Sequence, residues 1–290
     1  MKLSRILPPA LRPKGSKTGG PVVPVVRMQG AIMAAGSPLR PTLSLGSVAP
    51  LLQKAFSIKG PAVAISVNSP GGAPVQSRLI YRRIRDLAAE KKKDVIVFTE
   101  DVAASGGYMI ACAGDTIVAD PSSIVGSIGV ISQSFGFTEA IDKLGIERRV
   151  YTSGENKSTL DPFLPADPDD IEHLKALQSD VHRVFIDLVK EARGTKLADH
   201  PELFTGRFWA GGKAKELGLV DEIGDLRSTL RGRFGDDVNI KVIAPARGLF
   251  GRRTGGLGVS HGLASSVGAG LAETGLAAVA ERAQWSRYGL

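Results

Sequence analysis

Residues able to hold a metal ion or form disulfides are scarce in this sequence. Its 290 residues contain one cysteine, Cys112, and four histidines, at positions 173, 182, 200 and 261. One cysteine excludes an intrachain disulfide and any metal site built from several thiolates. In "MIACAG", Cys112 is interpreted as a buried packing residue. An acidic cluster at the start of a predicted helix is interpreted as charge complementing the helix N-terminus, not as a metal site: Asp167, Asp169, Asp170 and Glu172.

Long apolar runs are missing as well. Nowhere do about 18 apolar residues follow one another, so we expect no transmembrane helix. Pro8, Pro9 and Pro13 interrupt the basic opening "MKLSRILPPALRPKGSK" and break any apolar stretch of signal-peptide length. We therefore expect a cytoplasmic protein without a cleaved signal peptide.

Negative charge is scarce at the two ends of the chain, which accounts for the net charge of +8. Residues 1–20 carry +5 and residues 246–290 carry +3, whereas the 225 residues between them hold 27 basic and 27 acidic side chains. We predict a basic flexible leader (1–20), a folded domain (21–245) and a Gly/Ala-rich basic tail (246–290), partly helical near Leu263–Arg282. Such basic ends can contact anionic lipid peripherally. We expect no nucleic-acid interface, because no basic face interleaved with aromatics is found.

Strands and helices alternate along the folded domain. Strands are expected at Pro21–Met33, Pro61–Asn68, Asp94–Phe98, Asp115–Asp120, 147–154 and Val238–Ala244, and helices at Leu43–Phe56, 73–93, Thr138–Leu144 and Asp167–Arg193. This order is typical of an α/β fold with a parallel sheet. The continuous apolar run "PAVAISVN" predicts a strand buried on both faces. Pro21 and Pro24 favour an edge position for the first strand.

One serine stands where a hydrolase would present a nucleophile. Ser105 follows the strand "DVIVF" within "EDVAASGGYMI", and its small neighbours let the backbone turn and a substrate approach. The amide of Gly106, directly after it, is a natural donor to an oxyanion. The alternative is a helix cap, in which the serine oxygen accepts from a backbone N–H. A nucleophilic serine needs a base, and none of the four histidines lies in an obvious loop context.

Other stretches could supply the groups that such a serine needs. Gly71 and Gly72 in "NSPGG" follow a strand, and their amides can point at an oxyanion, although a plain glycine turn is the alternative. Lys157 lies in the polar loop "SGENKSTLDPF", where a solvated lysine is the alternative. A lysine base must be desolvated, because lowering a lysine pKa from about 10.4 to about 7 costs roughly 4.6 kcal/mol. Ser127 in "VGSIGV" could hold the neutral amine in place.

Taken together, these stretches resemble a known family. The order and spacing of "SVNSPGG", "ASGGYMIACAGDTIVADPSSIVGSIGV", "GENKS" and "WAGGKAKELGLVDEIG" resemble the signal peptide peptidase A family of serine–lysine peptidases, from about Val22 to Ile243. The separation of Ser105 and Lys157 by 52 positions agrees with the spacing of that family's nucleophile and base. The resemblance implies a Clp-protease/crotonase-like fold of stacked ββα units with a helical C-terminal section. It also implies a homo-oligomer whose neighbouring subunits help to complete the site.

The resemblance implies a role for each candidate residue. Ser105 would attack the peptide carbonyl, and Lys157 would take its proton and pass it to the leaving amine. Ser127 would orient the lysine, while the oxyanion donors would be Gly106 and either Gly71 or Gly72. The expected function is a serine endopeptidase acting on unstructured or apolar peptides, without metal or cofactor. Membrane-attached members carry an N-terminal transmembrane anchor that this chain lacks, so we expect a soluble or peripheral peptidase.

Two alternatives stay open. A catalytically silent scaffold of the same fold would bind peptides through its groove, with no reason to keep Ser105, Ser127 and Lys157 together. A crotonase-type enzyme acting on acyl-CoA would share the glycine amides. It has no need of Ser105 or Lys157, and no convincing basic cluster for CoA is found in the sequence.

Overall fold

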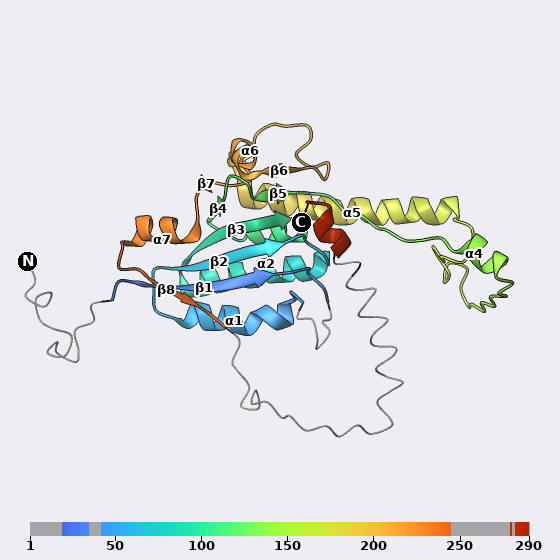
Figure 1. The fold of residues 1–290 in the computed structure, drawn as a ribbon, viewed down its shortest axis with the longest axis horizontal. Helices are drawn as coiled ribbons and strands as arrows, with labels where there is room; N and C mark the ends of the chain where they lie inside the picture. Colours follow the sequence, from blue (N-terminus) through green and yellow to red (C-terminus); the bar gives the residue numbers. More distant parts are fainter. Residues whose placement is uncertain (1–18, 35–41, 245–278, 280–281, 290) are drawn as a thin grey trace, which may run out of the picture.

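The computed structural model describes residues 19–34, 42–244, 279 and 282–289, and Figure 1 shows how their helices and strands are arranged. The strands are β1 (Val22–Gln29), β2 (Ala62–Ser69), β3 (Asp94–Ala104), β4 (Thr116–Ala119), β5 (Ile124–Gly126), β6 (Phe208–Ala210), β7 (Glu222–Ile223) and β8 (Asn239–Val242). The helices are α1 (Leu45–Ser57), α2 (Pro74–Lys91), α3 (Gly106–Ala111), α4 (Thr138–Lys143), α5 (Pro168–Arg193), α6 (Gly211–Glu216) and α7 (Leu226–Phe234), with a 3-10 turn at Gly194–Lys196. Most of the predicted leader and tail, with most of the helix expected near Leu263–Arg282, lies outside the described residues.

Within the described residues, eight strands form one sheet in the order β6-β5-β3-β2-β1-β8, with β4 pairing β3 and β7. All pairings are parallel except that between β5 and β6. The long strand β3 divides the sheet, because its first half pairs with β4 and its end pairs with β5. The parallel sheet and its crossover helices confirm the predicted α/β fold.

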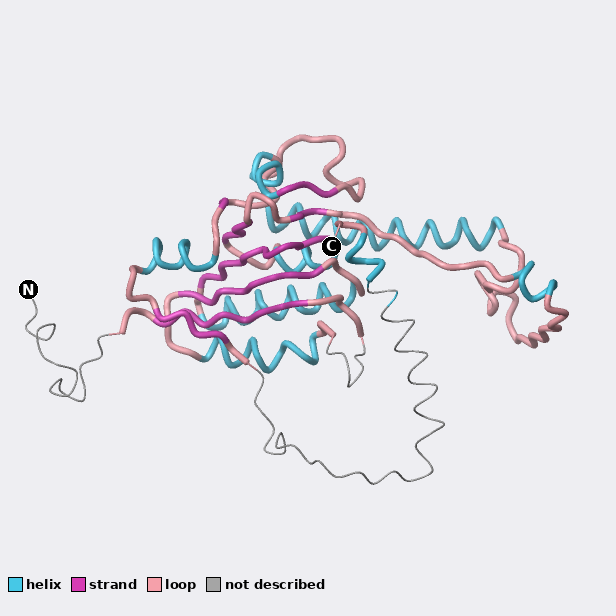
Figure 2. The backbone as a smooth tube through the Cα atoms, in the orientation of Figure 1, coloured by secondary structure: helices cyan, strands magenta, loops and turns pink. Residues whose placement is uncertain are grey.

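Side chains of the central strands alternate between two cores. In β2, Val63 and Ile65 face a large core that also contains residues of α1, α2, α3 and α5. Ala62 and Ala64 face a smaller core, to which α7 contributes Leu230. Figure 2 shows the strands side by side with helices packed around them. Burial of this strand on both faces, predicted from its apolar run, is confirmed.

One expectation about strands holds only in part, and another is wrong. β1 as a whole is not an edge strand, because it pairs with β2 on one side and β8 on the other, although its first part, residues 22–24, pairs with β8 alone. Pro24 is tolerated there since the pairing with β2 begins at Val25, so its missing N–H interrupts no ladder on that side. The strand expected at 147–154 is an irregular loop. Its β-favouring residues have no partner strand, and such preferences depend on pairing and packing.

Residues 131–180 form an arm that leaves the body of the molecule, and none of them is buried. The arm contains α4 and the first half of α5, and Figure 1 shows α4 near its tip, beyond the end of the sheet. At the tip the arm packs on itself, with the rings of Phe137 and Phe163 5.6 Å apart. The buried residues of α5 all lie in its second half: Phe185, Leu188, Val189 and Arg193. The arm is therefore held to its own chain mainly through the root of α5.

That root is fixed to the body by a buried ion pair. The Arg193 guanidinium donates to both carboxylate oxygens of Asp221, at 2.9 and 3.0 Å, and to the Gly218 carbonyl at 2.9 Å. Burial alone would raise the pKa of Asp221, but hydrogen bonds from Arg193, Lys196 and the Ile117 N–H outweigh it and lower the pKa to about 2. These bonds tie the end of α5 to the segment that follows α6.

The structure bears on two scarcities noted in the sequence, that of cysteine and that of long apolar runs. Cys112 is buried beside α3, as predicted, and burial raises the pKa of its thiol to about 12. The thiol is therefore protonated and inert at neutral pH. Among the described helices, none combines the length and apolarity that crossing a membrane requires.

Candidate active site

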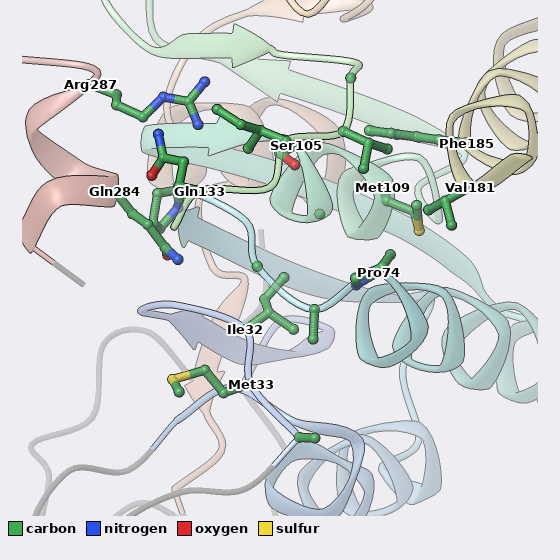
Figure 3. A pocket seen from close by; sticks show the side chains of 18 of the residues that line it. Ile32, Met33, Pro74, Ser105, Met109, Gln133, Val181, Phe185, Gln284 and Arg287 are labelled. Carbon is green, nitrogen blue, oxygen red and sulfur yellow. The ribbon is translucent and has the colours of Figure 1, made fainter. Parts of the chain in front are cut away.

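Ser105 occupies the turn between β3 and α3. Its backbone has φ 51° and ψ −123°, a conformation that non-glycine residues rarely adopt and that stores strain. Neighbouring backbone holds the turn: the Ser105 N–H donates to the Gly126 carbonyl at 2.8 Å, and the Ser105 carbonyl accepts from the Met109 N–H at 3.0 Å. The side chain makes no capping bond to α3, so the alternative of a helix cap is wrong. Ser105 instead lies at the wall of a cavity (Figure 3).

Glycine is required where the β2–α2 turn passes Ser105. A Cβ on Gly71 would lie 2.7 Å from Ser105 Cβ and 2.9 Å from the Ala104 carbonyl oxygen. Gly71 also has a φ of 101°, which residues with a side chain disfavour. The "PGG" stretch thus brings two turns of the sheet to contact distance, which agrees with the expected cluster of backbone amides.

The two glycines of this turn differ in where their amides point. The Gly71 N–H donates to Ser69 Oγ at 3.2 Å. Gly72 forms a parallel bridge with Ile32, in which the Ile32 N–H donates to the Gly71 carbonyl and the Ala73 N–H donates to the Ile32 carbonyl, each at 2.8 Å. The Gly72 N–H therefore points away from Ile32. Gly72, unlike Gly71, lines the cavity with Ser105 and Gly106.

The cavity beside Ser105 has a volume of about 500 Å³. Its walls are largely apolar: Ile32, Met33, Met109, Val130, Ile131, Val181 and Phe185. Figure 3 shows Met109, Val181 and Phe185 on one side of the serine and Met33 on another. Sequence patterns did not indicate these wall residues. A signal existed, because Val181 and Phe185 are four positions apart and share a face of α5.

Ser127 lies next to Ser105, just beyond the end of the neighbouring strand. The register pairs Ala104 with Gly126, which places the two serines just beyond the ends of β3 and β5. Ser127 has a φ of 54°, is 5% exposed, and its N–H donates to the Arg207 carbonyl at 2.7 Å. Its Oγ accepts a hydrogen bond from the Tyr288 hydroxyl at 3.3 Å. The structure thus brings Ser127 to the candidate site.

Lys157 is not brought to Ser105 within the chain. It is exposed, in the loop between α4 and α5, and it does not line the cavity. Within the described part of the chain, no histidine, lysine or carboxylate lines the cavity either. The described part of a single chain therefore places no base among the residues that line the cavity with Ser105.

The acidic cluster at the start of α5 serves the helix, as predicted. Asp167 caps it by accepting from the Asp169 N–H at 2.8 Å. The Asp170 carboxylate accepts from the Leu160 N–H at 2.9 Å. This second bond joins α5 to the loop that carries Lys157.

Comparison with known proteins connects these residues to a family. The model of peptidase family S49 matches residues 88–233, half of the chain, and this range contains Ser105, Ser127 and Lys157. The chain belongs to peptidase family S49. Its resemblance to the signal peptide peptidase A family is confirmed by the same match and by relatives that carry that name. Nothing in this assignment supports the acyl-CoA alternative.

Individual proteins match this chain over different lengths. A protein of Synechocystis sp. described as a protease, slr0021, is 34% identical over 216 residues, which is 72% of this chain and 77% of that protein. The chloroplastic serine protease SPPA of Arabidopsis thaliana is 32% identical over 215 residues, which is 72% of this chain and 32% of that protein. A Brucella abortus protein named Na(+)/H(+) antiporter NhaA is 62% identical over 275 residues, which is 92% of this chain. The chain spans 37% of that longer protein.

Proposed function

We propose that the protein is a serine endopeptidase that hydrolyses unstructured, apolar peptides, with Ser105 as nucleophile and Lys157 as general base. The strained turn that presents Ser105 at the wall of an apolar cavity carries this proposal. Membership of family S49 supports the same reaction. No histidine lines the cavity in the described part of the chain, so none is offered as the base in place of Lys157.

The proposed reaction uses backbone amides and two side chains. Ser105 Oγ attacks the carbonyl carbon of the scissile bond while the neutral Lys157 amine takes the hydroxyl proton. The oxyanion accepts from the N–H groups of Gly72 and Gly106; Gly71 is less suited, because its N–H already donates to Ser69. Lys157 then protonates the leaving amine, and water releases the acyl group from the serine. Ser127 holds the lysine amine by a hydrogen bond.

The position of Lys157 supports an active site shared between subunits. The arm that carries it buries none of its residues within the chain and exposes Phe135, Leu144 and Tyr151 by 80%, 72% and 89%. We infer that the arm packs against a second copy of the chain, because such exposed apolar surface marks an interaction site. Lys157 would then lie beside Ser105 of the partner subunit, and burial there favours the neutral amine that a base must be.

The cavity supports the choice of substrate. Met109, Val181 and Phe185 form an apolar wall beside Ser105, suited to an apolar side chain next to the scissile bond. An unstructured peptide can reach a serine that is only partly exposed, whereas a folded surface is too wide. Apolar, extended peptides are therefore the proposed substrates.

The cellular location is part of the proposal as well. The cytoplasm is expected from the sequence, with peripheral membrane contact through the basic ends. Residues 1–18 and 245–278 lie outside the described residues, so this expectation stays a prediction.

Mixing two inactive variants tests the reaction and the shared site together. Ser105→Ala removes the nucleophile and Lys157→Ala removes the base, so each alone should lose about a thousandfold or more in kcat/KM on a fluorogenic apolar peptide. When the two variants exchange subunits, about a quarter of the sites regain both groups, and activity should return. Lys143→Ala removes another exposed lysine of the arm and should keep the wild-type rate.

Each other outcome has a defined meaning. Wild-type activity in either single variant would show that the Ser105–Lys157 pair is wrong. Two inactive variants that do not complement each other would place the lysine in the same chain as its serine. Suppose that the wild type cleaves nothing while it and Ser105→Ala bind an apolar peptide equally. The silent peptide-binding scaffold would then replace the peptidase.

A further inference from the structure

The C-terminal end of the chain returns to the candidate active site. Residues 282–286 are helical, and residues 282–289, here called the C-terminal segment, lie against the cavity. Ala283, Gln284 and Arg287 line it together with Ser105. Figure 3 shows Gln284 and Arg287 reaching from this helix towards the side of the cavity that holds Gln133. The segment therefore forms part of the wall of the cavity that a peptide near Ser105 would enter.

Tyr288 fixes the segment at a second point. Its hydroxyl donates to Ser127 Oγ at 3.3 Å, and its ring meets the ring of Phe208 edge-on, with centroids 5.0 Å apart. Phe208 belongs to β6, which pairs with β5 directly before Ser127. The tyrosine thus covers the end of the strand from which Ser127 projects.

The contact with Tyr288 takes up one hydrogen-bonding position of a buried Ser127 oxygen. Ser127 is 5% exposed with the Tyr288 hydroxyl against its oxygen. A lysine amine that is to be held by the same oxygen must come within hydrogen-bond distance of it. Tyr288 therefore covers part of the approach that a lysine amine would need to reach Ser127.

We propose that the C-terminal segment is an internal inhibitor, which excludes peptides from the cavity and excludes the base from Ser127. The exclusion of the base rests on the proposed role of Lys157, whereas the exclusion of peptides does not. When the segment leaves, both the cavity and Ser127 become available at once. Peptide entry and completion of the dyad are coupled through one displaceable segment.

The segment is packed loosely enough to leave. Five of its eight residues are exposed. The Gln284 Oε1 is buried without a hydrogen-bond partner in the described part of the chain. A buried, unpaired carbonyl oxygen costs free energy that water or a new partner recovers on release. The seated state is therefore opposed by an internal penalty, as a reversible inhibitor requires.

Removing one hydroxyl tests the contact at Ser127 in the full-length protein. Tyr288→Phe keeps the ring on Phe208 but loses the donor to Ser127, so kcat/KM should rise about three- to tenfold. Ser286→Ala is the matched control, because its hydroxyl bonds within the segment, to the Ala283 carbonyl at 3.2 Å, and the rate should not change. An unchanged or lower rate for Tyr288→Phe would overturn the block at Ser127.

A reversible cross-link tests the seating of the segment without relying on catalysis. Gln133→Cys and Gln284→Cys place thiols on two chain segments that line the cavity, and the native Cys112 is buried. A bis-methanethiosulfonate reagent should join them within one chain. Binding of a fluorescein-labelled ten-residue Leu/Ala peptide, followed by anisotropy, should weaken about tenfold or more and recover when reductant cleaves the link. Each single-cysteine variant should bind the peptide with the same affinity before and after treatment with the reagent, because it cannot form the link.

The outcomes separate this inference from the proposed function. If both thiols react with a monofunctional reagent but no intrachain link forms, the segment is not seated and the inference fails. A link that leaves peptide binding unchanged also overturns it. If peptide binding weakens on cross-linking and recovers on reduction, but neither the wild type nor any variant hydrolyses a peptide, the inference of an internal inhibitor stands and the proposed peptidase function fails.

Discussion

At the scale of single residues, the candidate site depends on glycine, which has no side chain to obstruct the turn at Ser105. Ser105 holds a strained backbone, and Gly71 passes beside it at a distance that leaves no room for a Cβ. The sequence predicts a tight turn at Ser105 and a glycine turn after β2, but it does not predict that the two turns touch. It does not tell which glycine points its amide into the cavity, because that depends on the bridge between Gly72 and Ile32.

Adding one methyl group at Gly71 should therefore disable the site. In Gly71→Ala the new Cβ meets Ser105 and the Ala104 carbonyl, and we expect a loss of about 1–3 kcal/mol in unfolding free energy and loss of hydrolysis. Urea unfolding and peptide hydrolysis measure the two effects. Gly232→Ala is the control, because it lies in α7 with nothing within 4 Å of its Cβ and should keep both. Wild-type stability and activity in Gly71→Ala would show that the turns do not meet as described.

At the scale of elements, α5 has two different halves. Its second half packs into the core and is fixed by Arg193 and Asp221, while its first half is free of the body. The sequence predicts the helix closely, because its ends carry Asp167 and Gly194. Its periodicity does not reveal that only half of the helix is covered, since an exposed apolar stripe looks like a core-facing one.

The ion pair at the root of α5 should make stability depend on pH in the acid range. The folded pKa of Asp221, about 2, is depressed, so its contribution is present above about pH 4 and is lost as pH falls from about 4 to 2. The size is about 2 kcal/mol. Unfolding free energy of Asp221→Asn should thus be lower than that of the wild type at pH 7, with the gap narrowing below pH 4.

The matched control is an exposed ion pair near the middle of the same helix. Asp180 approaches Arg183 at 3.5 Å, and the two side chains are 71% and 72% exposed. Asp180→Asn should change the unfolding free energy by less than about 1 kcal/mol at any pH. A gap for Asp221→Asn that stays constant down to pH 2 would show that its carboxylate does not titrate as stated.

At the scale of the whole molecule, the fold separates a packed body from an unsupported arm. Motif order predicts the family, because "ASGGY" and "GENKS" are local signals that do not depend on where their segments lie. The arm and the C-terminal segment are not predicted, because their places follow from contacts between distant segments. The loop at 147–154 is the clearest example: its residues favour a strand, but the arm offers no strand to pair with.

Charges on the arm should prevent assembly while leaving the body folded. In Leu144→Glu/Tyr151→Glu the exposed apolar surface becomes acidic, so subunits should separate in sedimentation velocity and hydrolysis should fall about tenfold or more. The control is Val242→Glu on β8, an exposed apolar residue outside the arm, which should keep both assembly and rate. An arm variant that stays assembled and active would exclude the arm from the interface.

The distance between the Ser105 turn and the loop of Lys157 also bears on how the protein is made. In the described part of one chain no base lines the cavity with Ser105. If Lys157 acts across subunits as proposed, a newly made chain would hold a nucleophile with no base beside it and would be harmless to the nascent polypeptides around it. Proteolytic activity would then appear only where copies accumulate, and expression level itself would act as the switch.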